Sequence, residues 1–300
     1  MSSTSAFAVP GMRRALRLSA VVSMLVPAVF AVSTRPAHAS ITIVQDLCAS
    51  APGSTSVWSH SAVHNTWSQI FGQVRGIYGN GDFGLVVADG PTGDVYDVNG
   101  GVVRIGTPGA SFAVTNTTVY GLSPNRDGVY QYNQGTTWTR IGTQAAEIYA
   151  SAYGVFATHP VTGDIYRYRG TPDNWERIGG PGASFAVTND ALYALSPDRS
   201  AVYQYAGSPD AWTWIGGPAG QIYAGGFGLI ATSPTTGDAN RYLKTPGSWT
   251  RIGGPGAKFL PTNTELFALS PNRDAIYKYS GSGTAWTWFG GPAQDIAPCN

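Results

Sequence analysis

Charged side chains are scarce in this sequence: lysine, arginine, aspartate and glutamate make up only 12% of its residues. Beyond the first 39 residues, the few cations form no basic run. A protein without a basic patch has little electrostatic attraction to nucleic acid or to anionic lipid. We therefore expect neither nucleic-acid binding nor membrane insertion.

Long apolar runs are also missing, apart from one between Leu18 and Val32. That run is about 15 residues long, too short to cross a bilayer core of roughly 30 Å. It follows a basic stretch (Arg13 to Arg17) and precedes Ala37-His38-Ala39, a small-residue pattern typical of signal-peptidase cleavage. Residues 1–39 are predicted to be a signal peptide, with a retained anchor as the alternative, and the mature protein to be secreted and extracellular. The Arg13-Arg14 pair leaves export by the general or the twin-arginine route open.

A convergent catalytic set is the third thing that the sequence lacks. The chain beyond residue 39 has three histidines (His60, His64 and His159), and none falls at a repeated position. His60 and His64 fall on a predicted strand and turn rather than on one side of a helix, so we expect surface histidines and not metal ligands. No nucleophile motif or phosphate-binding glycine loop stands out. We expect no enzyme activity, no cofactor and no metal site.

The sequence is rich in glycine, tyrosine and tryptophan, with 39, 16 and 9 residues respectively. This composition suits short strands joined by tight turns. The about 260 residues beyond the leader are enough for one large domain. Residues 40–300 are accordingly predicted to form a single domain.

A repeated segment predicts the architecture of that domain. Trp-x-x-(Ile/Phe)-Gly begins at Trp138, Trp175, Trp212, Trp249 and Trp286, which lie 37 residues apart. Two earlier copies are Trp67 with Ile70-Phe71-Gly72, and Val103 with Ile105-Gly106, where valine replaces tryptophan. Each period holds four short strand-like runs, the content of one propeller blade. Seven copies predict an all-β, seven-bladed β-propeller of four-stranded antiparallel blades, and we expect the recurring tryptophans to pack between blades.

The two ends of the chain are predicted to share the seventh blade. Residues 47–69 align without a gap to residues 192–214 and supply three outer strands. Residues 290–297 repeat residues 216–223 and can supply the innermost strand, for which Ile41–Val44 is a competing candidate. The only two cysteines, Cys48 and Cys299, both fall on this blade. In an exported chain we expect a disulfide between them, with two free thiols as the alternative.

Two loop motifs alternate around the predicted ring and supply candidate ligand-binding residues. Arginine and aspartate can hydrogen-bond vicinal hydroxyls, and an exposed indole can stack on a sugar ring. Trp214 and Trp288 stand where other blades have arginine or glutamine, so the fold does not require them. Ordinary turn chemistry and spare packing are the alternatives. The candidates are Asp94, Asp164 and Asp238 of Thr-Gly-Asp, Arg126, Arg199 and Arg273 of Ser-Pro-(Asn/Asp)-Arg, and Trp214 and Trp288.

The Trp-x-x-Ile-Gly-Gly ends, the 37-residue period and the seven copies resemble the tectonin-type and tachylectin-like propellers. They are most similar to the seven-bladed bacterial lectins related to the Photorhabdus fucose-binding lectin, over nearly the whole chain after residue 39. The resemblance implies glycan-binding sites that lie between neighbouring blades and recur around the ring. We therefore expect a secreted, multivalent, carbohydrate-binding propeller whose partners are glycans or glycoconjugates. A protein-interaction propeller and a secreted hydrolase are the alternatives.

Overall fold

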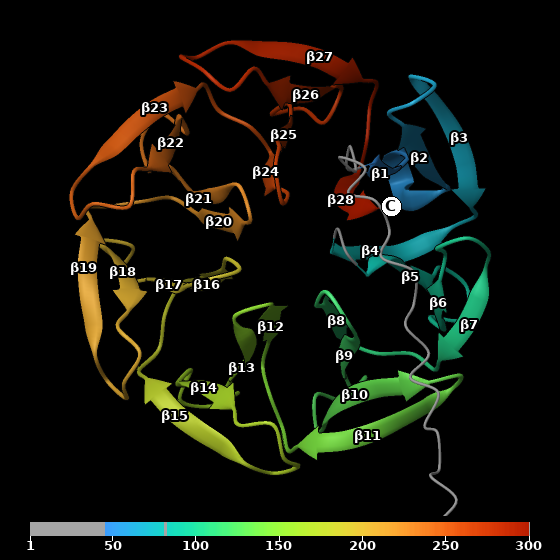
Figure 1. The fold of residues 1–300 in the computed structure, drawn as a ribbon, viewed down its shortest axis with the longest axis horizontal. Coiled ribbons are helices and arrows are strands. Elements are labelled where there is room, and N and C mark those ends of the chain that lie inside the picture. Colours follow the sequence, from blue (N-terminus) through green and yellow to red (C-terminus); the bar gives the residue numbers. More distant parts are fainter. Residues whose placement is uncertain (1–45, 81–82, 300) are drawn as a thin grey trace, which may run out of the picture. The chain divides into compact units, whose positions relative to one another are not determined.

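The computed structural model describes residues 46–80 and 83–299. The predicted signal peptide and the candidate strand Ile41–Val44 lie outside these residues. The described strands form seven four-stranded antiparallel sheets, arranged as the blades of a ring (Figure 1). This confirms the predicted fold class. We number the blades I to VI in chain order and call the blade shared by both ends the closing blade.

Each of blades I to VI runs in chain order from its innermost to its outermost strand. Blade I holds β4 (Val74–Asn80), β5 (Gly84–Asp89), β6 (Val95–Asp97) and β7 (Val103–Gly106). Blade II holds β8 (Ser111–Val114), β9 (Val119–Leu122), β10 (Val129–Gln134) and β11 (Thr137–Gly142). Blade III holds β12 (Ile148–Ser151), β13 (Gly154–Thr158), β14 (Ile165–Tyr168) and β15 (Trp175–Gly179). Blade IV holds β16 (Ser184–Val187), β17 (Leu192–Leu195), β18 (Val202–Tyr205) and β19 (Trp212–Gly216).

Blade V holds β20 (Ile222–Gly225), β21 (Gly228–Thr232), β22 (Ala239–Tyr242) and β23 (Trp249–Gly253). Blade VI holds β24 (Lys258–Pro261), β25 (Leu266–Leu269), β26 (Ile276–Tyr279) and β27 (Trp286–Gly290). The closing blade holds β28 (Asp295–Cys299), β1 (Asp46–Ser50), β2 (Val57–Ser61) and β3 (Thr66–Phe71), with the short 3-10 helix η1 (Pro52–Ser54) between β1 and β2. No helix in the described residues is long and apolar enough to cross a membrane.

The closing blade joins the two ends of the described chain. β28 takes the innermost place and pairs antiparallel with β1, as the repeat in residues 290–297 predicted. Cys48 of β1 and Cys299 of β28 form a disulfide, and their Cα atoms lie 5.7 Å apart. The predicted pairing is confirmed. Because the two cysteines are 251 residues apart in sequence, this one bond closes the ring covalently.

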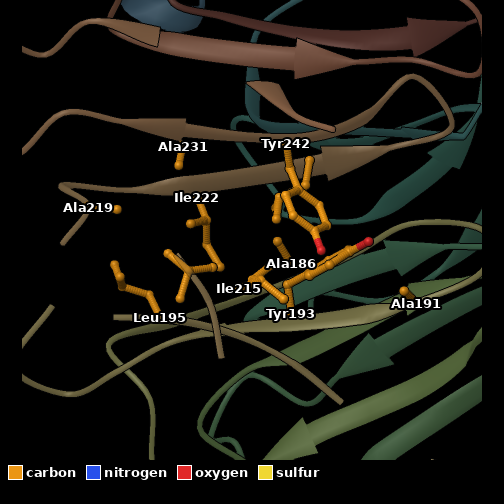
Figure 2. Close-up of a cluster of buried hydrophobic side chains, with 11 residues drawn as sticks. Ala186, Ala191, Tyr193, Leu195, Ile215, Ala219, Ile222, Ala231 and Tyr242 are labelled. Atoms are coloured by element: carbon orange, nitrogen blue, oxygen red, sulfur yellow. The ribbon is translucent and has the colours of Figure 1, made fainter. Parts of the chain in front are cut away.

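The hydrophobic core lies between the blades. Among residues 46–80 and 83–299, seven clusters of buried side chains occur, one at each blade boundary. Figure 2 shows the cluster between blades IV and V, where Leu195 and Ile215 of blade IV meet Ile222 of blade V. Both faces of each sheet are covered, so second strands such as β17 and β25 are buried along their whole length instead of alternating.

In blades II to VI the repeated tryptophan is hydrogen-bonded to the preceding blade, and the predicted packing of these tryptophans between blades is confirmed. The indole nitrogen of Trp212, for example, donates a hydrogen bond to the carbonyl oxygen of Ile178 in the preceding blade, 3.0 Å away. The indole also covers the repeat glycine of that blade, since a Cβ atom added at Gly179 would lie 2.5 Å from Trp212 Nε1. The same bond recurs at Trp138, Trp175, Trp249 and Trp286. Tryptophan and glycine of the motif therefore fit each other across a blade boundary.

The boundary between the closing blade and blade I reverses this arrangement. Phe71, not Gly72, occupies the place of the repeat glycine, because it pairs with Val57 as Gly216 pairs with Val202. Val102 holds the place of the tryptophan in blade I, because Val103 pairs with Asp97 as Thr139 pairs with Gln131. The predicted assignment of Val103 to this place is wrong by one residue. The ring of Phe71 contacts Tyr96 of blade I, with centroids 5.5 Å apart. Here the preceding blade supplies the large side chain, and the following blade supplies the small one.

Candidate binding clefts between the blades

The loops of the propeller fall into two groups, because successive turns of an antiparallel sheet lie at opposite ends of its strands. We call one end the linker face. It carries the linkers between blades and the loops between second and third strands, and hydrogen bonds join the two, as from Ala145 N to Arg126 O (3.0 Å). The other end, the hairpin face, carries the turns between first and second and between third and fourth strands. Both predicted loop motifs lie on the linker face.

The three candidate arginines reach across to the following blade. Arg126 Nη1 lies 3.1 Å from a carboxylate oxygen of Glu147, which precedes β12. Arg199 Nη1 donates to the carbonyl oxygen of Gly220 (2.6 Å), and Arg273 Nη1 donates to that of Gln294. All three have φ near 60°, a left-handed conformation that arginine seldom adopts. Each of these side chains therefore joins its turn to the linker that enters the following blade.

The three candidate aspartates each bind an arginine of the outermost strand of their own blade. The pairs are Asp94 with Arg104 (2.6 Å), Asp164 with Arg177 (3.1 Å) and Asp238 with Arg251 (2.8 Å). The hydrogen bond from Arg177 holds the pKa of Asp164 below its ordinary value, and Arg251 does the same to the pKa of Asp238. The structure therefore does not bring the aspartates together with the candidate arginines, which belong to other blades.

Trp214 and Trp288 lie on the outermost strands β19 and β27 and point away from the core. Their exposed fractions are 48% and 68%. Trp214 lies near Gly247 of blade V, where a Cβ atom would be 3.6 Å from the indole. Both indoles are accessible to a ligand at the outer rim of the ring.

In the part of the chain that the structure describes, clefts open on the linker face at four of the blade boundaries, and equivalent positions line each of them. Every cleft is bounded by the linker that enters a blade, the end of that blade's second strand, its outer-strand tryptophan and one third-strand side chain. Their volumes are about 410 Å³ at the I/II boundary, 400 Å³ at II/III, 230 Å³ at IV/V and 180 Å³ at VI/closing. In that order the tryptophans are Trp138, Trp175, Trp249 and Trp67, and the third-strand residues are Tyr130, Tyr166, Asn240 and Trp58.

The II/III cleft has the richest set of polar groups. Arg140, His159 and Asp173 line it together with Tyr166 and Trp175. The arginine at the corresponding position of blade III is Arg177, which pairs with Asp164. Blade II has Gly128 in place of that aspartate. Within residues 46–80 and 83–299, no carboxylate lies at ion-pair distance from the Arg140 guanidinium. A cation and a carboxylate thus face one cleft beside two aromatic rings.

None of the eight sequence candidates is among the residues that line these four clefts. The backbone oxygens of Arg126 and Arg199 accept hydrogen bonds from Ala145 and Ala219, which are lining residues. The cleft residues themselves were missed because each site combines a linker with strands that are distant in sequence. The sequence did contain one signal of these clefts. The third-strand position that lines them varies among Tyr, Asn and Trp, so the repeat does not require one particular side chain there.

One histidine departs from expectation. His60 is buried, with 4% of its surface exposed, and its ring packs against Trp67 and Phe289. The prediction that it is a surface residue is wrong, because the closing blade places this strand position against blade VI. His60 Nε2 shares a hydrogen bond with Asn65 (3.2 Å).

Comparisons with known proteins give the fold alone. No protein-family model matches the chain, and no curated protein does. The chain is similar to the crinkly WD40 ectodomain of the Arabidopsis thaliana receptor kinase ACR4, with a TM-score of 0.56 and 14% identity over 83% of this chain and 93% of that one. It is also similar to the Physcomitrella patens receptor kinase CR4 ectodomain, with a TM-score of 0.51 and 11% identity over 83% and 74% of the two chains. YCF48 bound to D1 peptide gives a TM-score of 0.50 and 12% identity over 71% and 80%. These likenesses agree with the β-propeller fold described above.

Proposed function

We propose that this protein is a secreted, multivalent carbohydrate-binding propeller, a binding module rather than an enzyme. The observation that carries the proposal is the recurrence of one cleft at four blade boundaries of the linker face. Each cleft sets an aromatic edge beside loop backbone and hydroxyl groups, and the two larger ones have the volume of small-ligand sites. The resemblance to lectins with sites between blades supports the same conclusion. The Cys48–Cys299 disulfide and the leader-like residues 1–39 support secretion.

Recurrence determines how such a protein would bind. A single shallow cleft holds a sugar weakly, since few groups contact it and water competes for its hydroxyls. Several equivalent clefts on one face would engage a densely glycosylated surface together, and effective concentration would raise the overall affinity by roughly 10²–10⁴. In this proposal the candidate arginines hold the linkers that bound the clefts, and the candidate aspartates orient arginines of the outermost strands. Trp214 and Trp288 offer further stacking surfaces at the outer edge.

The test is a glycan array with the protein lacking residues 1–39, followed by variants on the best glycan. Tyr130→Ala and Tyr166→Ala together remove the aromatic third-strand wall from the two largest clefts, and we expect binding to fall at least tenfold. Thr250→Ala, on the exposed outer strand β23, is the control and should bind as the parent does. Trp214→Ala with Trp288→Ala tests the outer indoles separately. Failure of every glycan to bind, or full binding by the tyrosine double variant, would overturn this assignment.

A protein-interaction propeller that uses the same face is the second candidate. One fold relative, YCF48, has a structure bound to a peptide. A peptide ligand would need backbone hydrogen-bonding partners along the clefts and would not compete with free sugar. Competition between the array glycan and its free monosaccharide therefore separates the two candidates.

A further inference from the structure

A fifth cavity opens on the hairpin face, at the IV/V boundary. Its volume is about 400 Å³, and it lies between the turns β16–β17, β20–β21 and β22–β23. The polar side chains that line it are Thr188, Asp190, Tyr193, Arg241, Tyr242 and Lys244. The cavity is separate from the linker-face cleft at the same boundary, which is lined by other residues.

A change in how neighbouring hairpins contact one another explains the space. Between blades III and IV, Ser151 Oγ donates to the carbonyl oxygen of Thr188 (2.8 Å) and joins the two hairpins. Thr188 holds the equivalent position in blade IV, but its hydroxyl donates within its own hairpin, to Asp190 (2.6 Å). Gly225 replaces the serine in blade V, and that hairpin lies tightly on blade VI, where Phe227 N donates to Thr262 O (2.6 Å). The blade V hairpin thus contacts its other neighbour, and a cavity is left on the blade IV side.

Arg241 is held in place inside this cavity. Its guanidinium lies over the Phe227 ring, 4.2 Å from the centroid, and its Nη2 donates to the Phe227 carbonyl oxygen (3.2 Å). Among the residues that the structure describes, no carboxylate lies at ion-pair distance from Arg241. A fixed guanidinium with unused N–H groups is suited to bind a carboxylate through two hydrogen bonds.

The rest of the lining offers partners for hydroxyl groups. Lys244 and Asp190 form an ion pair across the mouth (3.3 Å), with 76% and 65% of their side chains exposed. Such an exposed pair is weak and can exchange for ligand contacts. Tyr193 and Tyr242 lie beside each other as a wall, with ring centroids 6.3 Å apart (Figure 2). Burial raises the pKa of Tyr193 to about 12, so its hydroxyl is protonated and able to donate at neutral pH.

We propose that this cavity binds a carboxylate-bearing monosaccharide unit of the hexuronate type. Arg241 takes the carboxylate, Asp190 and Lys244 take ring hydroxyls, and the tyrosines cover one face of the sugar. The site does not depend on the linker-face clefts. Its success or failure is therefore separable from that of the function proposed above.

The experiment titrates the whole protein with glucuronate, with glucose as the neutral analogue, and follows the shifts of backbone amide resonances. We expect glucuronate to shift amides of the three hairpins at millimolar concentration, and glucose to bind at least tenfold more weakly. Arg241→Gln should weaken glucuronate binding at least tenfold. Arg167→Gln is the matched control, since Arg167 makes the same contact with Tyr153 O (3.2 Å) in blade III, where Ser151 joins the hairpins.

Several results would overturn the proposal. They are absence of binding, equal binding of glucose, equal losses in the two arginine variants, and binding of an acidic peptide in place of glucuronate. If Arg241→Gln fails to fold, Lys244→Ala is the second variant. It lies on an exposed turn and should weaken glucuronate binding several-fold while the protein stays folded; full binding by this variant would equally contradict the proposal.

Discussion

The indole nitrogen of Trp249 donates a hydrogen bond to the carbonyl oxygen of Ile215, 2.8 Å away in the preceding blade. The next residue, Gly216, lies under the same indole, and an added Cβ atom would be 2.7 Å from Nε1. One copy of the motif thus contributes a hydrogen-bond acceptor and a glycine without a side chain to the boundary with the following blade. The same copy contributes its tryptophan to the boundary with the preceding blade. Each boundary depends on side chains from two successive copies of the repeat.

Gly216→Ala should therefore destabilise the protein. The new methyl group must displace the Trp249 indole, and we expect a loss of about 1–3 kcal/mol, as for other overpacked sites. Gly217→Ala is the control, because a Cβ atom there meets no atom within 4 Å. Urea unfolding measures both. Equal stability of the two variants would show that the indole moves away at no cost.

The reversed boundary can be tested by exchanging its partners. Val102→Trp alone should destabilise the protein, because Phe71 fills the place that the indole needs, and Phe71→Gly alone should leave a void. The double variant restores the arrangement of the other boundaries. Its loss of unfolding free energy should therefore be smaller, by about 1–3 kcal/mol, than the sum of the two single losses. Additive effects in the double-mutant cycle would mean that residues 71 and 102 do not share one space.

Opening the disulfide should lower stability without changing the fold. The chain-entropy model gives about 5 kcal/mol for a loop of this length, as an upper value. Cys48→Ala with Cys299→Ala avoids leaving polar groups in the buried site, where the cysteines are 1% and 2% exposed. Thermal unfolding of oxidised, reduced and doubly substituted protein gives the comparison. Identical midpoints would show that the β1–β28 pairing alone closes the ring.

The three left-handed arginines give a stability prediction that differs from the sequence hypothesis. Each fastens the linker face to the following blade, so replacing Arg126, Arg199 and Arg273 by alanine should cost about 1 kcal/mol at each site. Glycan binding should fall by less than tenfold, since these side chains border the clefts. A variant of unchanged stability that no longer binds would instead make the arginines direct ligands, as the sequence alone suggested.

The half-buried Tyr149 and the buried Tyr193 should make the protein sensitive to alkali. Burial raises the pKa of Tyr149 and of Tyr193 to about 12, with Glu147 and Asp190 adding to the respective effects. Unfolded tyrosine titrates near pH 10. The folded state then keeps protons that the unfolded state has lost, so stability is full below about pH 10 and falls as the pH rises toward 12. Phenolate absorbance and urea midpoints follow this, and Tyr149→Phe with Tyr193→Phe should reduce the slope.

The ring could be predicted from the sequence because its repeat is local and nearly complete. The copies from Trp138 to Trp286 define the period, and the alignment of residues 47–69 locates the closing blade and its disulfide. The substitution of Phe71 for a glycine escaped notice because Gly72 follows it and mimics the motif. The cavity beside Arg241 depends on the direction in which the β20–β21 hairpin bends, toward blade VI and away from blade IV. That direction is set by contacts of Gly225 and Phe227 with the next blade, which no single repeat contains.

The position of the disulfide has a mechanical consequence. Asp46 and Cys299, where the described chain enters and leaves the ring, are paired in the β1–β28 ladder. A pulling force applied between them passes through that ladder and the nearby bond from Cys48 to Cys299. The chain of blades I to VI lies between the two cysteines and outside the path of the load. A load applied between these two residues would therefore extend the chain by only a few residues, and the linker and hairpin faces would keep their shape.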